Sequence, residues 1–156
     1  MLTSKVDVLV VEDNIHDVNF IRQAVLESGL HIKILHIQNG ADAIDYMERC
    51  ALTGDYPRMI LTDLRMPKMD GYELISYIKA SDQSCDIPLV VMSTSEQDCD
   101  VERSYRMGAS SYLVKPMDVD IFIENLASLF RYWLVLNQPA VTDGSMASFM
   151  RFSCAA

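Results

Sequence analysis

The chain has 156 residues and a formal net charge of −9, and 50% of its residues are hydrophobic. This length corresponds to one domain, which can bury a core without disulfides or a structural metal. The acidic balance disfavours binding to nucleic acid or to an anionic membrane surface, because both depend on clustered Lys and Arg.

The cysteines and the N-terminal stretch indicate where such a chain would function. Cysteines at positions 50, 85, 99 and 154 are scattered, with no C-x-x-C pair and no histidine at ligand spacing. They predict neither a zinc site nor a disulfide, so we expect reduced thiols in a cytoplasmic protein. The N-terminal apolar stretch is too short and too charged for a signal peptide or a membrane span.

Five short apolar runs, each the length of a strand, alternate with helical patterns along the chain. The runs occupy residues 6–11, 32–37, 59–62, 89–92 and 112–114. The helical patterns are Val18, Ile21 and Val25, ended by Gly29; Ile44 and Met47 with Ala51; Leu74, Ile75 and Ile78; a weaker pattern over about 98–107; and Phe122, Leu126, Leu129, Phe130, Trp133 and Leu134, in a helix that Asp118 could cap.

The alternation of strand and helix predicts an α/β fold, in which a five-stranded parallel sheet carries helices on both faces. We expect residues 1–138 to form this domain, with an extended last helix. Residues 139–156 would be a C-terminal tail with no output domain. The stretch 49–58 before the third strand predicts a long loop, marked by Gly54 and Pro57.

Polar side chains follow four of the five predicted strands at their carboxyl ends, where open α/β sheets bind ligands. They are Glu12 and Asp13 after the first strand, Asp63 after the third, Ser93 and Thr94 after the fourth, and Lys115 after the fifth. Each residue alone is an ordinary turn, cap or surface residue, but their joint occurrence indicates a site.

This combination of groups suits metal-assisted phosphoryl chemistry. Three neighbouring carboxylates raise one another's pKa unless a cation lies among them, and oxygen ligands favour Mg²⁺. An aspartate can itself become an aspartyl-phosphate, as a covalent intermediate. Lys115 and Ser93 would then contact the phosphoryl oxygens.

Four motifs carry a resemblance to a known family: VVEDN at 10–14, LTDLRMPKMDG at 61–71, PLVVMSTS at 88–95 and SYLVKP at 111–116. In order and spacing they resemble the receiver domain of two-component response regulators. The resemblance covers about residues 5–136 and implies the doubly wound, flavodoxin-like (βα)5 fold. The long stretch before the third strand and the RYWL segment at 131–134 further resemble the stand-alone regulators that partner phytochrome-type histidine kinases.

The resemblance implies a role for each residue of the site. Asp63 would be the phosphoacceptor; Asp13, Asp63 and the backbone carbonyl of Arg65 would bind Mg²⁺, with Glu12 acting on the metal through water. Ser93, the backbone of Thr94 and Lys115 would contact the phosphoryl group, the Lys115–Pro116 bond would be cis, and Ser93 and Tyr112 would form the switch pair.

These roles lead to the expectation of a response regulator rather than an enzyme. It would accept a phosphoryl group from a sensor histidine kinase onto Asp63, with Mg²⁺, and would signal by phosphorylation-dependent protein contact. Alternatives are a phosphorelay intermediate that passes the group to a histidine phosphotransfer protein, a receiver used only for binding, and a phosphohydrolase of the haloacid dehalogenase type. The last requires a second Asp at the position of Arg65.

Two further expectations concern the surface. Trp133 and Leu134 belong either to the core or to a partner-facing patch, and we expect a homodimer or a kinase-docking surface on the face of the fourth helix, fifth strand and fifth helix. Arg65 is long and cationic, so we expect it to reach over the site and slow dephosphorylation.

Overall fold

The five apolar runs form one parallel sheet with the strand order β2-β1-β3-β4-β5 in the computed structural model, which describes residues 5–139. The strands are β1 (Val8–Val11), β2 (Ile34–Ile37), β3 (Met59–Asp63), β4 (Leu89–Ser93) and β5 (Ser111–Val114). β1 and β2 begin later than expected because the Asp7 carboxylate accepts a hydrogen bond from the Lys33 amide at 2.9 Å in place of a ladder bond. The predicted fold is confirmed.

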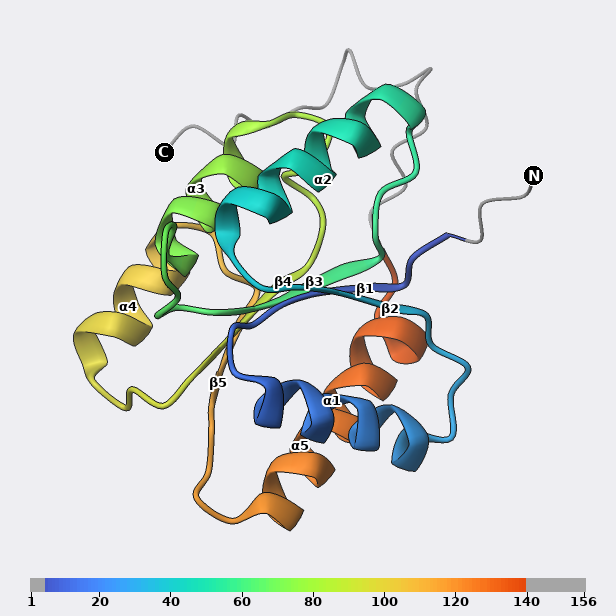
Figure 1. Cartoon of the computed structure of the whole chain (residues 1–156), viewed down its shortest axis with the longest axis vertical. Helices are drawn as coiled ribbons and strands as arrows, with labels where there is room; N and C mark the ends of the chain where they lie inside the picture. The colour runs from blue at the N-terminus through green and yellow to red at the C-terminus, as the bar shows by residue number, and fades with distance from the viewer. Residues whose placement is uncertain (1–4, 140–156) are drawn as a thin grey trace.

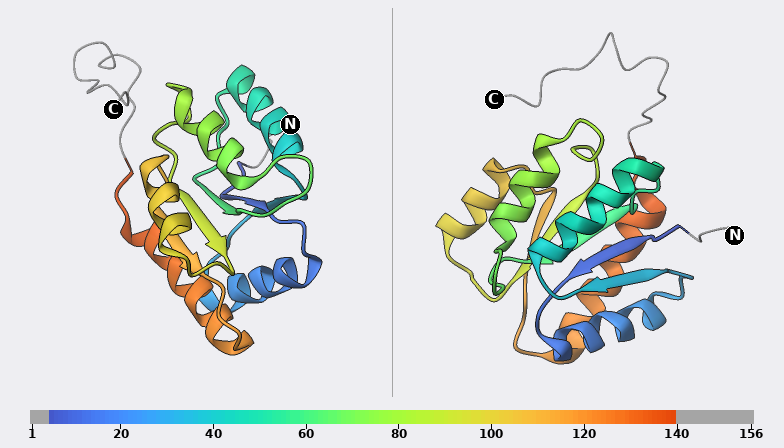
Figure 2. Two further views of the ribbon diagram at one scale, coloured as in Figure 1. Left: turned by 90° about the vertical axis from the view of Figure 1, so that its left-hand side faces the viewer. Right: turned by 45° about the horizontal axis from the view of Figure 1, so that its top comes forward.

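Helices cover both faces of this sheet, as Figures 1 and 2 show. They are α1 (Ile15–Ser28), α2 (Gly40–Thr53), α3 (Gly71–Ala80), α4 (Asp98–Arg106) and α5 (Val119–Arg131), followed by a π-helical turn, η1 (Tyr132–Leu136). α1 and α5 pack together on one face, and α2, α3 and α4 lie on the other. This arrangement follows from right-handed crossovers between parallel strands.

Local signals in the sequence set the ends of several helices. Asp118 caps α5, where its Oδ1 accepts hydrogen bonds from the amides of Asp120 and Ile121. Gly29 ends α1 in the left-handed region, at φ 72°, a conformation that glycine adopts without the steric cost of a Cβ. Both predicted boundaries are confirmed.

The core consists of two apolar layers, one on each side of the sheet. Toward α2 and α3 the strands contribute Leu9, Val11, Ile60, Leu89 and Val91. Toward α1 and α5 they contribute Val8, Val10, Met59, Leu61, Val90 and Met92. Because both faces of the central strands are buried, these strands are nearly continuous apolar runs rather than alternating ones.

The region of α2 differs from the prediction. The helix continues to Thr53 and ends at Gly54, so the first half of the stretch 49–58 is helical rather than loop. Cys50 faces the core and Ala51 is exposed, one position away from the expected apolar stripe. Within the described residues Cys50, Cys85 and Cys99 form no disulfide, and Cys154 lies outside those residues.

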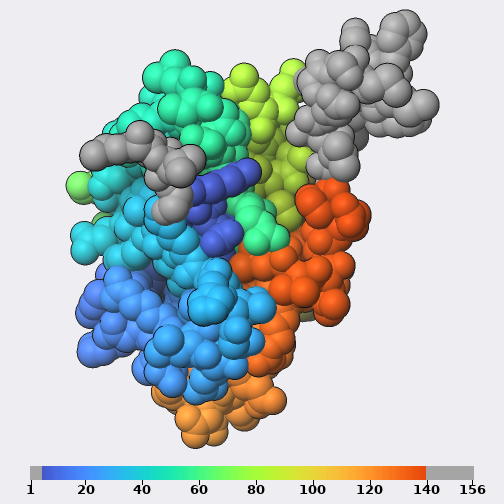
Figure 3. All heavy atoms as spheres, turned by 90° about the vertical axis from the view of Figure 1, so that its right-hand side faces the viewer, coloured from blue at the N-terminus to red at the C-terminus, as the bar shows by residue number. Residues whose placement is uncertain are grey.

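The turn η1 decides which side chains after α5 reach the core. Leu134 is buried and Trp133 half-buried, both against the layer formed with α1 and α5. Tyr132, Val135 and Leu136 are exposed instead. Figure 3 shows this red segment at the surface, and Arg131, the last residue of α5, donates hydrogen bonds to the Glu27 and Ser28 carbonyls at the end of α1.

Two other expectations concern the extent of the chain. Within residues 5–139, each helix is too short or too polar to cross a membrane. The expected tail, residues 139–156, lies outside the described residues apart from Pro139.

Truncating Leu126 tests the assignment of the α1–α5 layer. Leu126 in α5 is 0% exposed, whereas Leu52 in α2 is 87% exposed. Leu126→Ala should lower the free energy of unfolding by about 2–5 kcal/mol, because it removes buried methyl groups and leaves a cavity. Leu52→Ala, the matched control, should change it by less than about 0.5 kcal/mol. Urea denaturation followed by circular dichroism measures both, and equal losses would contradict the assignment.

Candidate functional site

Three of the predicted carboxylates meet at the carboxyl edge of the sheet. β1 and β3 are neighbours, so Glu12 and Asp13, directly after β1, lie beside Asp63 at the end of β3. Carboxylate oxygens of the three residues lie within 4.8 Å of one another. Strand order reverses at this point, since β2 lies on the far side of β1, and open α/β sheets form their ligand crevice at such a reversal.

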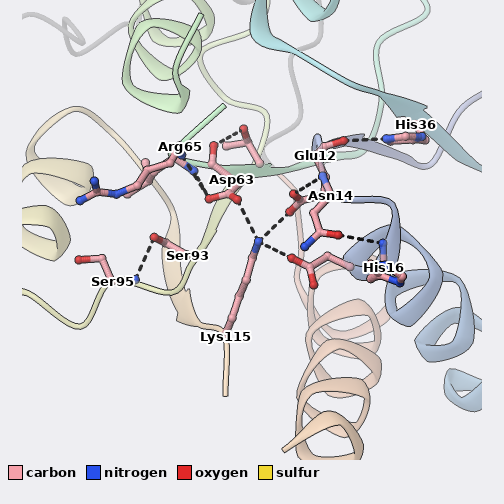
Figure 4. Close-up of polar contacts among 12 residues, drawn as sticks. Glu12, Asn14, His16, His36, Asp63, Arg65, Ser93, Ser95 and Lys115 are labelled. Atoms are coloured by element: carbon pink, nitrogen blue, oxygen red, sulfur yellow. Dashed lines mark hydrogen bonds and ion pairs between the residues drawn. The ribbon is translucent and has the colours of Figure 1, made fainter. Parts of the chain in front are cut away.

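Lys115 lies at the centre of this cluster (Figure 4). Its Nζ donates to Glu12 Oε2 at 2.8 Å, to Asp17 Oδ2 at 2.7 Å and to Asp63 Oδ2 at 2.9 Å. An ammonium group has three hydrogens, so each has a carboxylate acceptor. The lysine follows β5, where its own amide donates to the Ser93 carbonyl at 2.8 Å and extends the ladder between β4 and β5.

Burial and charge act against each other on Glu12 and Lys115. The Glu12 side chain is fully buried, and this desolvation raises its pKa to about 7 although Lys115 favours the ionised form. Burial alone would lower the pKa of Lys115, but Glu12, Asp17 and Asp63 together raise it above its usual value. The ammonium therefore stays charged, and the site carries more negative than positive groups.

The Asp63 side chain is positioned through both of its oxygens. Oδ1 accepts hydrogen bonds from the amides of Leu64 at 2.6 Å and Arg65 at 3.3 Å, while Oδ2 faces Lys115. The start of α3 lies against the same turn, where a Cβ on Gly71 would come within 2.3 Å of the Asp63 carbonyl oxygen. Only glycine permits this approach. The carboxylate is 13% exposed, so a small reactant can reach it.

The chemistry of the donor set fits Mg²⁺. Glu12, Asp13 and Asp63 offer carboxylate oxygens only, which suit a hard cation that keeps several waters. Glu12 is buried and Asp13 is exposed to solvent, so Glu12 lies deeper in the site and Asp13 lies at its surface. The carbonyl of Arg65 as a further ligand stays a prediction.

The predicted switch residues are linked through the loop after β4. Ser93 is buried, and its Oγ accepts a hydrogen bond from the Ser95 amide at 3.2 Å. The Tyr112 hydroxyl donates to the Ser95 carbonyl at 2.9 Å. Thr94, between the two serines, is exposed. Ser93 and Tyr112 are therefore connected by Ser95, which lies outside the predicted switch pair.

Two expectations about individual residues differ from the structure. The described residues contain no cis peptide bond, so the predicted cis Lys115–Pro116 bond is wrong; trans is the favoured form even before proline, and Lys115 reaches its carboxylates with it. The Arg65 guanidinium is directed away from Lys115, on the Ser95 side of the site (Figure 4), and lies 3.5 Å from Asp100 Oδ2.

Asp17 is a member of the site that sequence reasoning missed. It lies in the first turn of α1, the helix that follows Glu12 and Asp13 in the chain. Its contact with Lys115, 98 residues away in sequence, belongs to no motif. Its position in the first turn of a helix does not single it out, because acidic residues there also interact favourably with the helix dipole.

Comparison of this chain with known proteins identifies its relatives. Residues 8–127 match the family of response regulator receiver domains. The probable methanogenesis regulatory protein FilR2 of Methanothrix harundinacea is 37% identical over 132 residues, which cover 84% of this chain and 85% of that protein. Response regulator Rcp1 of Synechocystis sp. is 28% identical over 132 residues, with coverage of 81% and 88%.

Solved structures agree with this relationship. The phosphorylated cyanobacterial phytochrome response regulator RcpA superposes with a TM-score of 0.81 at 26% identity, covering 88% of this chain and all of that one. The Mn²⁺-bound form of Rcp1 superposes with a TM-score of 0.79 at 27% identity, covering 88% of this chain and 99% of that one. This chain therefore belongs to the response regulator receiver domain family of two-component signalling.

Proposed function

We propose that Asp63 accepts a phosphoryl group from the phosphohistidine of a sensor histidine kinase, in a reaction that depends on Mg²⁺. The observation that supports this most directly is the buried Lys115 ammonium at 2.9 Å from Asp63 Oδ2, beside two further carboxylates that can hold a cation. Receiver domains bind Mg²⁺ or Mn²⁺ at an acidic site of this kind.

The transfer requires the Asp63 carboxylate to act as a nucleophile. One of its oxygens forms a bond to phosphorus while the phosphorus–nitrogen bond of the phosphohistidine breaks, and the imidazole leaves with the electron pair. Lys115 stabilises the negative charge on the phosphoryl oxygens, and the Ser93 hydroxyl donates a hydrogen bond to one of them. Glu12, Asp13 and Asp63 would hold Mg²⁺, which would supply the remaining positive charge.

The same chain of contacts carries the output. A hydroxyl hydrogen bond from Ser93 to the phosphoryl group draws this side chain toward Asp63, which disturbs the bond that its Oγ accepts from Ser95. Tyr112, bonded to the Ser95 carbonyl, then moves with the loop. This local charge event biases the packing of the face formed by α4, β5 and α5.

Partners follow from this face and from the relatives. We propose a cytoplasmic protein that signals by protein contact, with a phytochrome-type histidine kinase as its partner, because RcpA is described as a phytochrome response regulator. Exposed apolar side chains of Tyr105, Val119 and Ile121 lie on α4 and α5, which supports a homodimer or a docking surface there. Transfer to a histidine phosphotransfer protein remains the alternative output, and a transfer assay separates the two.

Incubation with acetyl phosphate tests the acceptor. Intact mass should rise by one phosphoryl group in the presence of Mg²⁺, because acetyl phosphate replaces the kinase as donor. The Asp63→Asn variant, which lacks the nucleophile, and a sample with chelator should show no gain. A gain of equal size in the Asp63→Asn variant would place the acceptor elsewhere.

Replacing Asp13 tests the metal site without any phosphoryl transfer. Mg²⁺ should raise the Tm of the wild-type chain, because it binds the folded state, and the rise should grow with the ratio of Mg²⁺ concentration to Kd. Asp13→Asn should require at least about tenfold more Mg²⁺ for the same rise, since loss of a charged ligand costs at least the roughly 1.4 kcal/mol that a tenfold change represents. The matched control Asp45→Asn, an exposed change on α2, should titrate like the wild type. Identical titrations of all three would remove Asp13 from the metal site.

A further inference from the structure

Asp100, in the first turn of α4, joins three other segments that surround the site. Its carboxylate accepts hydrogen bonds from the Ser95 hydroxyl at 2.5 Å, after β4, and from the Tyr72 hydroxyl at 2.9 Å, in α3. The Arg65 guanidinium, after β3, lies at 3.5 Å. No motif and no role in the phosphoryl transfer accounts for this residue.

The two hydroxyl contacts fix the Asp100 carboxylate in an ionised state. Hydrogen bonds from Ser95 and Tyr72, together with the charge of Arg65, lower the pKa of Asp100. Tyr72 is itself held, because the Arg103 guanidinium stacks over its ring at 3.8 Å. Asp100 therefore presents a fixed negative charge to Arg65.

Arg65 has two possible acceptors within the reach of its side chain. Its amide donates to Asp63 Oδ1 at 3.3 Å, so its Cα lies beside the phosphoacceptor. Its side chain is 73% exposed and adjoins a pocket of about 260 Å³ with Tyr72, Asp100 and Arg103 in the lining, so it is free to change direction. A phosphoryl group on Asp63 would offer the guanidinium bidentate oxygen contacts in competition with Asp100.

We propose that Asp100 is a positioning residue that draws Arg65 away from the phosphoryl group on Asp63 and thereby shortens the lifetime of the phosphorylated state. This inference rests on the proposed function of Asp63. In hydrolysis, a water oxygen bonds to phosphorus, the bond from phosphorus to the Asp63 oxygen breaks, and the protons of the water leave with the phosphate. The water must approach from the open side, opposite the breaking bond, and Arg65 covers that side only during the fraction of time in which it has left Asp100.

Three variants measure this competition through the half-life of the phosphorylated chain. The protein is phosphorylated with acetyl phosphate and Mg²⁺, the donor is removed by desalting, and decay is followed by intact mass. Asp100→Asn should lengthen the half-life about two- to fivefold, the range expected for loss of an exposed ion pair. Asn keeps one oxygen acceptor for one of the two hydroxyls, and its NH₂ group can donate to the other, so both partners retain a hydrogen bond without the charge. Arg65→Ala should shorten the half-life, because the water approach is then always open.

The double variant separates positioning from a merely structural role. In the Arg65→Ala background, Asp100→Asn should have no effect, since there is no guanidinium left to release. The matched control Asp98→Asn, an exposed change in the same turn of α4, should leave the half-life unchanged. An equal lengthening by Asp100→Asn with and without Arg65, or a shortening, would overturn the inference while leaving the acceptor intact. A wild-type chain that gains no phosphoryl group would overturn the proposed function and this inference together.

Discussion

The excess of negative charge around Lys115 is the constraint on which the site depends. Glu12, Asp17 and Asp63 share a single ammonium group, Asp13 lies beside Glu12 and Asp63, and Glu12 is fully removed from solvent. A buried carboxylate is costly unless it is paired and hydrogen-bonded. Lys115 meets this requirement only in part, so the site is suited to receive a further cation. Any phosphoryl group added to Asp63 increases the negative charge and strengthens that requirement.

The parallel sheet makes this concentration of charge possible. Its members come from the ends of three strands and the first turn of one helix, and the pair Lys115–Glu12 is separated by 103 residues. Two apolar layers fix the strands from both faces, which leaves their carboxyl ends as the place where polar groups can collect. Lys115 reaches the carboxylates only when β5 pairs with β4, so the site forms only in the complete fold.

Much of the fold and of the site follows from the sequence because both rest on repeated, local signals. Apolar runs of strand length locate the sheet, and the polar residues that end those runs must share one edge. Asp17 and Asp100 lack such a signal, since an acidic residue in the first turn of a helix is equally explained by the helix dipole. Asp17 comes close to Lys115, and Asp100 to Arg65, only through tertiary packing.

The end of α5 shows a different limit of sequence reasoning. A period of 3.6 residues places Trp133 and Leu134 on the apolar stripe, but gives no indication that the helix widens into a π-turn at Tyr132. Trp133 and Leu134 nevertheless pack against the core, as the apolar stripe predicts. The sequence also does not show whether a peptide bond before proline is cis or trans, as the trans Lys115–Pro116 bond illustrates.

Ser95 gives the connection between the site and α4 a particular character. Its amide bonds to Ser93, its carbonyl to Tyr112 and its hydroxyl to Asp100, so three links pass through one residue. Hydrogen bonds weaken steeply as their geometry departs from the favoured distance and angle. Rotation about the backbone of this single residue would disturb several links at once. The loop after β4 would then respond in a stepwise manner, and intermediate degrees of rearrangement would be sparsely populated.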